Sequence, residues 1–128
     1  MKKISVVVPT YNEEENIVKC LESLRNQTIP REDYEIIIVD APSKDKTQEL
    51  AKKNGADKVI VQKSKGISGA RNDGFMVADS EIVATTDCDI EIPKDWLEKK
   101  LQILGTEYIG MLQNPKYGYG KTLNPCID

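Results

Sequence analysis

Two aspartates spaced one residue apart are the residues of this sequence best suited to chemistry. Asp87 and Asp89 directly follow an apolar, β-prone run at residues 82–86. Side chains two positions apart on an extended backbone point the same way, so both carboxylates should project together from a strand end. Neighbouring anions repel each other unless a cation lies between them. A hard divalent cation such as Mg²⁺ or Mn²⁺, carrying phosphate oxygens on its far side, meets that requirement. The simpler alternative is an acidic turn.

Polar residues also follow two other predicted strands. Pro9, Thr10 and Tyr11 come after the first strand, and Asp40 comes after the second. Tyr11 could stack on a nucleobase or rest on a ribose, and Asp40 could accept a hydrogen bond from a uracil or guanine ring N–H. Each group also has a purely structural alternative. Residues 9–11 could form a turn that leads into a helix, and Asp40 could cap the turn that follows it.

Two charged residues near predicted helix starts complete the candidate set. Glu13 could orient a sugar or its own loop, or simply complement a helix dipole. Arg71 lies in a glycine-flanked helix start, where a guanidinium and exposed backbone N–H groups can hold a diphosphate. The competing interpretation of Arg71 is a surface ion pair with Asp73 or Glu81.

The elements that must position these residues alternate strictly between strand and helix. Hydrophobic patterning predicts strands at 4–8, 34–39, 58–61 and 82–86 with a last strand within 107–113, and helices at about 13–26, from Asp45 to Gly55, at 67–78 and from Pro93. Asn12 with Glu15, and Asp45 with Gln48, have the spacing of helix caps. The alternation predicts an α/β fold with a mostly parallel sheet covered by helices on both faces. Ligands bind beyond the carboxyl ends of such strands, so the candidate residues should meet at one edge.

Composition narrows the classes of function. The 128 residues, with 39% hydrophobic and 30% charged residues, suit one globular domain, and a net charge of -3 gives no basic face for nucleic acid. The sequence contains no histidine, which excludes Ser-His-Asp and Cys-His catalysis. Its three scattered cysteines predict neither a disulfide framework nor a zinc site and suit the cytoplasm. No apolar run is long enough for a signal peptide or a transmembrane segment.

The combined pattern resembles family 2 glycosyltransferases of the GT-A fold. The matching motifs are Val6 to Glu13, Ile37 to Asp40 with Ser43, Asp45 and Thr47, Ala70-Arg71-Asn72 with Gly74, and Asp87-Cys88-Asp89 with Pro93, Trp96 and Leu97. Their order and spacing agree over roughly residues 1–104. Each motif is weak alone, but the combination is specific.

The resemblance implies a Rossmann-like nucleotide-diphospho-sugar transferase fold and assigns roles to individual residues. Pro9, Tyr11, Asp40, Arg71 and Asp87 would contact the nucleotide diphosphate, and Asp89 would bind the bridging Mg²⁺ or Mn²⁺. The donor would be a UDP- or GDP-sugar, and the acceptor a glycan, lipid or protein. Peripheral membrane association is implied by the resemblance alone.

The sequence departs from the family pattern in ways that keep other functions open. Ala41 stands where the family has an acid, and no general base can be assigned, because in the family that base lies further downstream. We therefore expect residues 1–112 to form a donor-binding domain, residues 113–128 an irregular tail, and the acceptor half to be missing. An exposed sheet edge would then favour a homo-oligomer. The alternatives are a non-catalytic nucleotide-sugar-binding module and, with less support, a nucleotidyltransferase.

Overall fold

A five-stranded sheet forms the centre of the molecule, and helices pack on it. The computed structural model describes residues 3–104 and 111–113. In chain order the elements are β1 (Ile4–Thr10), α1 (Ile17–Arg25), the 3-10 helix η1 (Arg31–Asp33), β2 (Tyr34–Asp40), α2 (Thr47–Lys53), β3 (Lys58–Val61), α3 (Gly66–Val77), β4 (Ile82–Thr85), α4 (Trp96–Leu104) and β5 (Met111–Gln113). This order confirms the predicted alternation of strands and helices.

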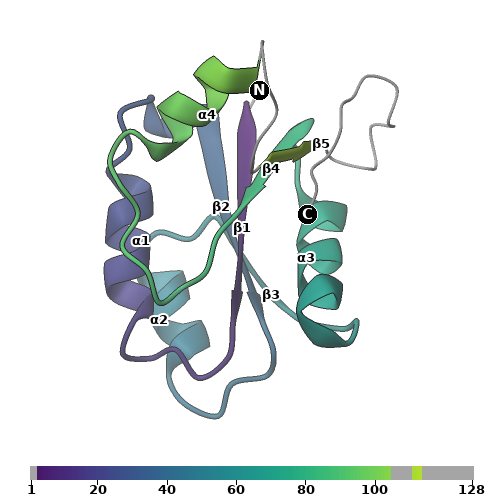
Figure 1. The fold of residues 1–128 in the computed structure, drawn as a ribbon. Coiled ribbons are helices and arrows are strands. Elements are labelled where there is room, and N and C mark those ends of the chain that lie inside the picture. Colours follow the sequence, from purple (N-terminus) through teal and green to yellow (C-terminus); the bar gives the residue numbers. More distant parts are fainter. Residues whose placement is uncertain (1–2, 105–110, 114–128) are drawn as a thin grey trace.

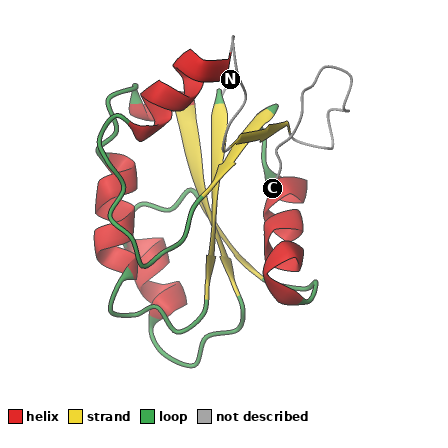
Figure 2. Ribbon diagram, in the orientation of Figure 1, coloured by secondary structure: helices red, strands yellow, loops and turns green. Residues whose placement is uncertain are grey.

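The strands lie in the order β3-β2-β1-β4-β5. β1 to β4 pair in parallel, whereas β5 runs antiparallel to β4. The helices lie on both sides of this sheet, as Figures 1 and 2 show. A mostly parallel sheet between helices is the architecture predicted from the sequence. In the register of β1 and β2, Thr10 pairs with Asp40, so the two strands end together.

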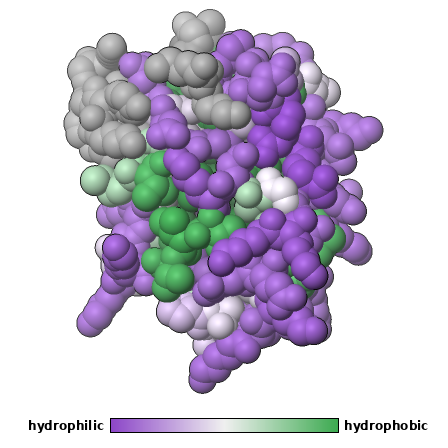
Figure 3. All heavy atoms as spheres, turned by 180° about the vertical axis from the view of Figure 1, so that it is seen from behind, coloured by the Kyte–Doolittle hydropathy of each residue, from purple (hydrophilic) through white to green (hydrophobic). Residues whose placement is uncertain are grey.

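Alternation along the strands divides the core into two layers. Ile4, Val6 and Val8 of β1 belong to a cluster that includes residues of α1, α2 and α4. Val7 belongs instead to a second cluster with residues of α3, including Phe75. Both faces of β1 are therefore buried, which explains its continuous apolar sequence. Seen from behind, the molecule carries hydrophobic residues near the centre of its surface among mostly hydrophilic ones (Figure 3).

Glycine lets α3 approach the sheet closely. A Cβ atom on Gly74 would lie 2.5 Å from a methyl carbon of Val7, and one on Gly69 would lie 2.7 Å from the carbonyl carbon of Ser64. Neither position has room for a side chain unless its surroundings move. The missing side chain of Gly74 therefore lets α3, and with it Arg71, pack against the sheet, while that of Gly69 lets the loop before α3 pack on the helix.

Some predictions concern the end of the chain. The last strand was expected within residues 107–113, and β5 occupies 111–113 of that range, whereas residues 105–110 lie outside the described residues. Gln113, expected to begin the tail, is the last residue of β5, and 114–128 lie outside the described residues. The division at residue 112 stays a prediction. Among the helices that the structure describes, none is both long and apolar enough to cross a membrane.

Candidate functional site

The predicted polar groups meet at the carboxyl edge of β2, β1 and β4. A cavity of about 450 Å³ opens there. Its lining consists of Pro9, Thr10, Tyr11, Glu13, Ala41, Gln62, Gly66, Ile67, Asp87, Cys88 and Asp89. Six of the eight residues singled out from the sequence contribute to this lining, and the two that do not are Asp40 and Arg71. The topology thus brings the β1 end and the paired aspartates to one cavity.

Asp87 and Asp89 are exposed, while Cys88 between them is buried, as alternation predicts. Within the described part of the chain, neither carboxylate has a hydrogen bond or an ion pair with another residue. No cluster of three or more acidic or cysteine side chains able to hold a metal occurs among the described residues. Two free carboxylates suit Mg²⁺ or Mn²⁺ if a ligand and water complete the oxygen shell, as they commonly do for Mg²⁺.

Asp40, the last residue of β2, is fully buried and is not part of the cavity lining. One oxygen accepts hydrogen bonds from the hydroxyls of Thr10 (2.7 Å) and Ser43 (2.6 Å). The other accepts from the backbone N–H of Ser43 (2.8 Å) and the side-chain amide of Gln48 (2.8 Å). Asp40 therefore caps the following turn, the local alternative considered above, and ties the ends of β1 and β2 together. Its contact with a nucleobase stays a prediction.

The loop between β1 and α1 departs from its predicted structure. Asn12 adopts a left-handed conformation (φ 52°), and α1 begins at Ile17 after Asn16, whose side chain makes no capping hydrogen bond. The predicted Asn12–Glu15 capping box is therefore wrong. Asn12 instead receives a hydrogen bond from the backbone N–H of Lys44 (2.9 Å), and its own N–H donates to Ser43 (2.7 Å). Asn12 thus joins two loops at the cavity rim rather than starting a helix.

The second predicted cap is formed only in part. The Asp45 carboxylate accepts hydrogen bonds from the hydroxyl and backbone N–H of Thr47 and from the N–H of Glu14. The Thr47 hydroxyl contributes most to lowering the pKa of Asp45, and these backbone donors add to it. Gln48 does not return to the helix start, because its amide donates to Asp40. Thr47 also accepts from the N–H of Glu13 (2.8 Å), so this helix start holds the loop that carries Tyr11.

Arg71 lies on α3 beside the end of β4. Its Nε donates to the Thr85 hydroxyl at 3.2 Å, and it forms no ion pair with any residue in the described part of the chain. Asp73, the proposed surface partner, instead accepts hydrogen bonds from the backbone N–H groups of Ser64 and Lys63 and from the Ser64 hydroxyl. These donors, led by the Ser64 N–H, lower the pKa of Asp73. The alternative in which Arg71 forms an ion pair with Asp73 is therefore wrong. The guanidinium keeps N–H donors for a ligand.

The structure adds cavity residues that sequence reasoning missed. Gln62 donates to the carbonyl oxygens of Ser64 (2.6 Å) and Gly66 (2.8 Å), which shapes the loop before α3. Gly66 has a positive φ of 78°, a conformation that glycine adopts readily. Ile67 is 57% exposed and, like Tyr11 at 55%, presents apolar surface to the cavity. Only Gly66 carried a usable sequence signal, as a glycine immediately before a predicted helix.

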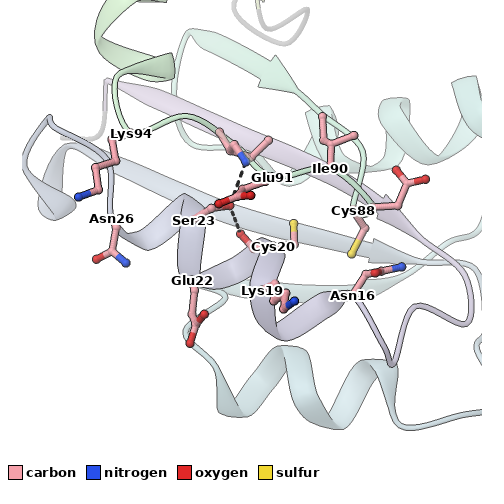
Figure 4. A pocket seen from close by; sticks show the side chains of 12 residues that line it. Asn16, Lys19, Cys20, Glu22, Ser23, Asn26, Cys88, Ile90, Glu91 and Lys94 are labelled. Atoms are coloured by element: carbon pink, nitrogen blue, oxygen red, sulfur yellow. Dashed lines mark hydrogen bonds between the residues drawn. The ribbon is translucent and has the colours of Figure 1, made fainter.

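A second cavity of about 490 Å³ lies between α1 and the loop at residues 86–95 (Figure 4). Its lining consists of Asn16, Lys19, Cys20, Glu22, Ser23, Asn26, Cys88, Asp89, Ile90, Glu91, Ile92 and Lys94. It shares Cys88 and Asp89 with the first cavity. The loop is held on α1 by a hydrogen bond from the Ile92 N–H to the Ser23 hydroxyl (3.3 Å), and the Gln27 amide just beyond α1 donates to the Pro93 carbonyl (2.8 Å).

A mostly parallel α/β sheet with acids and a helix N-terminus at its carboxyl edge is typical of nucleotide-binding proteins. The model for glycosyl transferase family 2 matches residues 5–125, and the chain belongs to this family. The relatives of known structure confirm the GT-A fold.

The similar proteins are glycosyltransferases of archaea and bacteria. The glycosyltransferase AglE of Haloferax volcanii is 34% identical over 115 residues, which are 84% of this chain and 38% of AglE. A crystal structure of Staphylococcus aureus TarS with UDP is 32% identical with a TM-score of 0.72, covering 80% of this chain and 32% of that one. The mannosyltransferase PcManGT of Pyrobaculum calidifontis, in complex with GDP-Man and Mn²⁺, is 31% identical with a TM-score of 0.64, covering 71% and 28%. The chain therefore spans well under half the length of these relatives.

Proposed function

We propose that this chain is the donor-binding part of a glycosyltransferase. It would bind a UDP- or GDP-sugar together with Mg²⁺ or Mn²⁺ and present the sugar to an acceptor hydroxyl. The observation that carries the proposal is the single cavity that joins the end of β1, the free carboxylates Asp87 and Asp89, and the loop before α3. The solved relatives that hold UDP, or GDP-Man with Mn²⁺, support the same ligand class.

Each cavity residue has a role that its position suits. Tyr11 and Ile67 offer apolar surfaces for the base or ribose, and Pro9 and Thr10 also line the cavity. Asp87 would contact the nucleotide, Asp89 would hold the metal, and Glu13 would orient the sugar or its loop. Because Asp40 is saturated with internal donors, it acts in the bound state chiefly by fixing Thr10.

Arg71 would act on the diphosphate from the side of β4. Its Nε donates to the Thr85 hydroxyl at the end of β4, and the start of the same helix, at Gly66 and Ile67, lines the cavity. The metal, when bound, would stabilise the negative charge of the departing diphosphate. Transfer further requires a base that takes the proton of the acceptor hydroxyl, and no described residue is assigned that role.

A glycan, lipid or protein acceptor, peripheral membrane association and self-association stay predictions. For the compartment we propose the cytoplasm. Cys20 and Cys88 are both free thiols, which suits a reducing environment.

A thermal-shift titration tests the proposed function. UDP, GDP and their common sugar conjugates are each added with and without Mn²⁺. A ligand at 100 times its dissociation constant should stabilise the fold by about 2.7 kcal/mol. Asp89→Ala should abolish the Mn²⁺-dependent part of the shift, whereas Glu32→Ala, an exposed acid in η1 before the start of β2, should leave it unchanged.

Two outcomes would contradict the proposal. The first is no Mn²⁺-dependent shift with any nucleotide in a folded wild-type protein. The second is an equal shift in wild type and Asp89→Ala at saturating Mn²⁺, which would remove the metal role of Asp89. A shift without sugar transfer to any acceptor would instead favour the binding-module alternative.

A further inference from the structure

Two cysteines far apart in the sequence meet beside the candidate metal site. Cys20 lies on the buried face of α1, and Cys88 lies between Asp87 and Asp89. Both belong to the same core cluster, with exposed fractions of 1% and 3%. Both side chains also line one cavity, and both thiols are free. Figure 4 shows the two sulfur atoms in the space between helix and loop.

The two cysteines border a cavity even though little of their surface is exposed. Both line the 490 Å³ cavity between α1 and the loop. The rest of that lining is largely polar, including Asn16, Lys19 and Glu91, so water and small polar solutes can enter it. A reagent in the cavity would meet both sulfur atoms at once.

A bond between these sulfur atoms would move the loop rather than the helix. A disulfide requires an S–S distance of about 2.05 Å, which is shorter than a contact between thiols. Cys20 is fixed within α1, where its N–H bonds the Asn16 carbonyl (3.0 Å). Cys88 lies in a loop without helix or strand, between the bond from the Thr86 N–H to the Val7 carbonyl (3.3 Å) and the bond from the Ile92 N–H to Ser23 (3.3 Å). The movement must therefore fall on the segment that contains Asp89.

We propose that Cys20 and Cys88 form an oxidisable dithiol, and that its disulfide weakens divalent-metal binding at Asp87 and Asp89. The metal consequence rests on the proposed function, whereas formation of the disulfide does not.

The oxidant is a small disulfide of the glutathione class. One cysteine thiolate attacks that disulfide, which gives a mixed disulfide and releases one glutathione thiol. The second cysteine then displaces the other glutathione, so two thiols lose their protons, one S–S bond forms and one breaks, and two electrons reduce the oxidant. Transient disulfides of this kind are the ones that occur in reducing compartments.

Peptide mapping of the folded chain tests the dithiol directly. After treatment with oxidised glutathione and alkylation of remaining thiols, mass spectrometry should find the Cys20 and Cys88 peptides joined, and dithiothreitol should separate them. Cys126→Ser is the matched variant that keeps the pair, and it should give the same cross-link. Cys20→Ser should give none. Free alkylation of both thiols after oxidation, or bonds to Cys126 in their place, would overturn the inference.

A second probe requires no substitution. Phenylarsine oxide binds two neighbouring thiols together, so it should protect Cys20 and Cys88 of the wild-type chain from alkylation in parallel. Protection of neither thiol would contradict their proximity. This probe keeps the inference testable if Cys20→Ser fails to fold.

The metal consequence is measured by Mn²⁺-dependent UDP binding in the reduced and the oxidised chain. Disturbed support of a metal ligand typically costs about 10- to 100-fold in affinity, so we expect roughly a tenfold or greater loss on oxidation, reversed by dithiothreitol. Equal binding in both states would overturn the metal consequence alone. If the reduced chain bound no UDP with Mn²⁺, both the metal consequence and the proposed function would be overturned. The peptide map would still test whether Cys20 and Cys88 form a disulfide.

Discussion

Replacing Asp40 by alanine should destabilise the fold substantially, because its buried carboxylate collects four hydrogen-bond donors. Without it, the Thr10 hydroxyl, which is only 4% exposed, loses its acceptor. A buried donor left unsatisfied costs about 1–3 kcal/mol, and each bond to a charged acceptor contributes about 1.5–3 kcal/mol. Ser43 and Gln48 are half-buried, so their donors can bond water instead, which limits the free energy lost with these hydrogen bonds. We expect a total loss of about 2–4 kcal/mol.

Urea unfolding of wild type and Asp40→Ala measures this loss. Thr10→Val is the matched control, since it removes one donor and leaves the carboxylate with three, for an expected loss of about 1 kcal/mol. Thermal unfolding should follow, with a fall in Tm on the order of 10 °C for Asp40→Ala. If Asp40→Ala were as stable as wild type to within about 0.5 kcal/mol, the carboxylate would not be the structural cap described here. A direct role in nucleotide binding would then be the better explanation of Asp40.

Three further predictions concern α3 and its neighbours. Gly74→Ala should lose about 1–3 kcal/mol despite the better helix propensity of alanine, because its Cβ would lie 2.5 Å from a Val7 methyl carbon; urea unfolding should show a smaller additional loss in the Val7→Ala background. Asp73→Asn should lower Tm near neutral pH but not in acid. Donors from Ser64 and Lys63 lower the pKa of Asp73 in the folded state. The carboxylate therefore stabilises the fold above its unfolded pKa of about 3.8, and this stabilisation is lost as the pH falls through the pKa of the folded state. Thermal scans across pH check this, and a Tm difference that persists in acid would contradict it. Arg71→Ala should weaken UDP or GDP binding far more than binding of the bare nucleoside, and an equal loss in calorimetric titrations would remove Arg71 from the diphosphate.

Local patterning was sufficient to predict the strands, the helices and the edge at which the candidate residues meet. Burial of a face leaves a pattern that can be recognised in a short stretch of sequence. Examples are the β-branched run of β1 and the spacing of Leu21 and Leu24 in α1. Parallel strands then bring their carboxyl ends to one edge, so Tyr11 and Asp89 could be placed at one site before any contact was known.

Side-chain partners were harder to predict, and the errors share one cause. Asn12 and Gln48 were expected to cap helices, because spacing along the chain identifies caps. Each instead bonds a residue that another element brings near, Lys44 for Asn12 and Asp40 for Gln48. A polar side chain takes whichever partner the fold presents, and the first of these pairs is separated by 32 residues.

The sequence by itself determined the architecture of this protein and the residue types at its ligand edge, since both follow from periodicity and from where each strand ends. Only the tertiary structure decided that Asp40 is saturated by internal donors, that Arg71 bonds Thr85, and that Cys20 and Cys88 line one cavity together with Asp89. The physical reason is distance along the sequence. Burial patterns depend on residues that are close together in the sequence. Hydrogen bonds and side-chain contacts between distant segments form only once the sheet has brought those segments together.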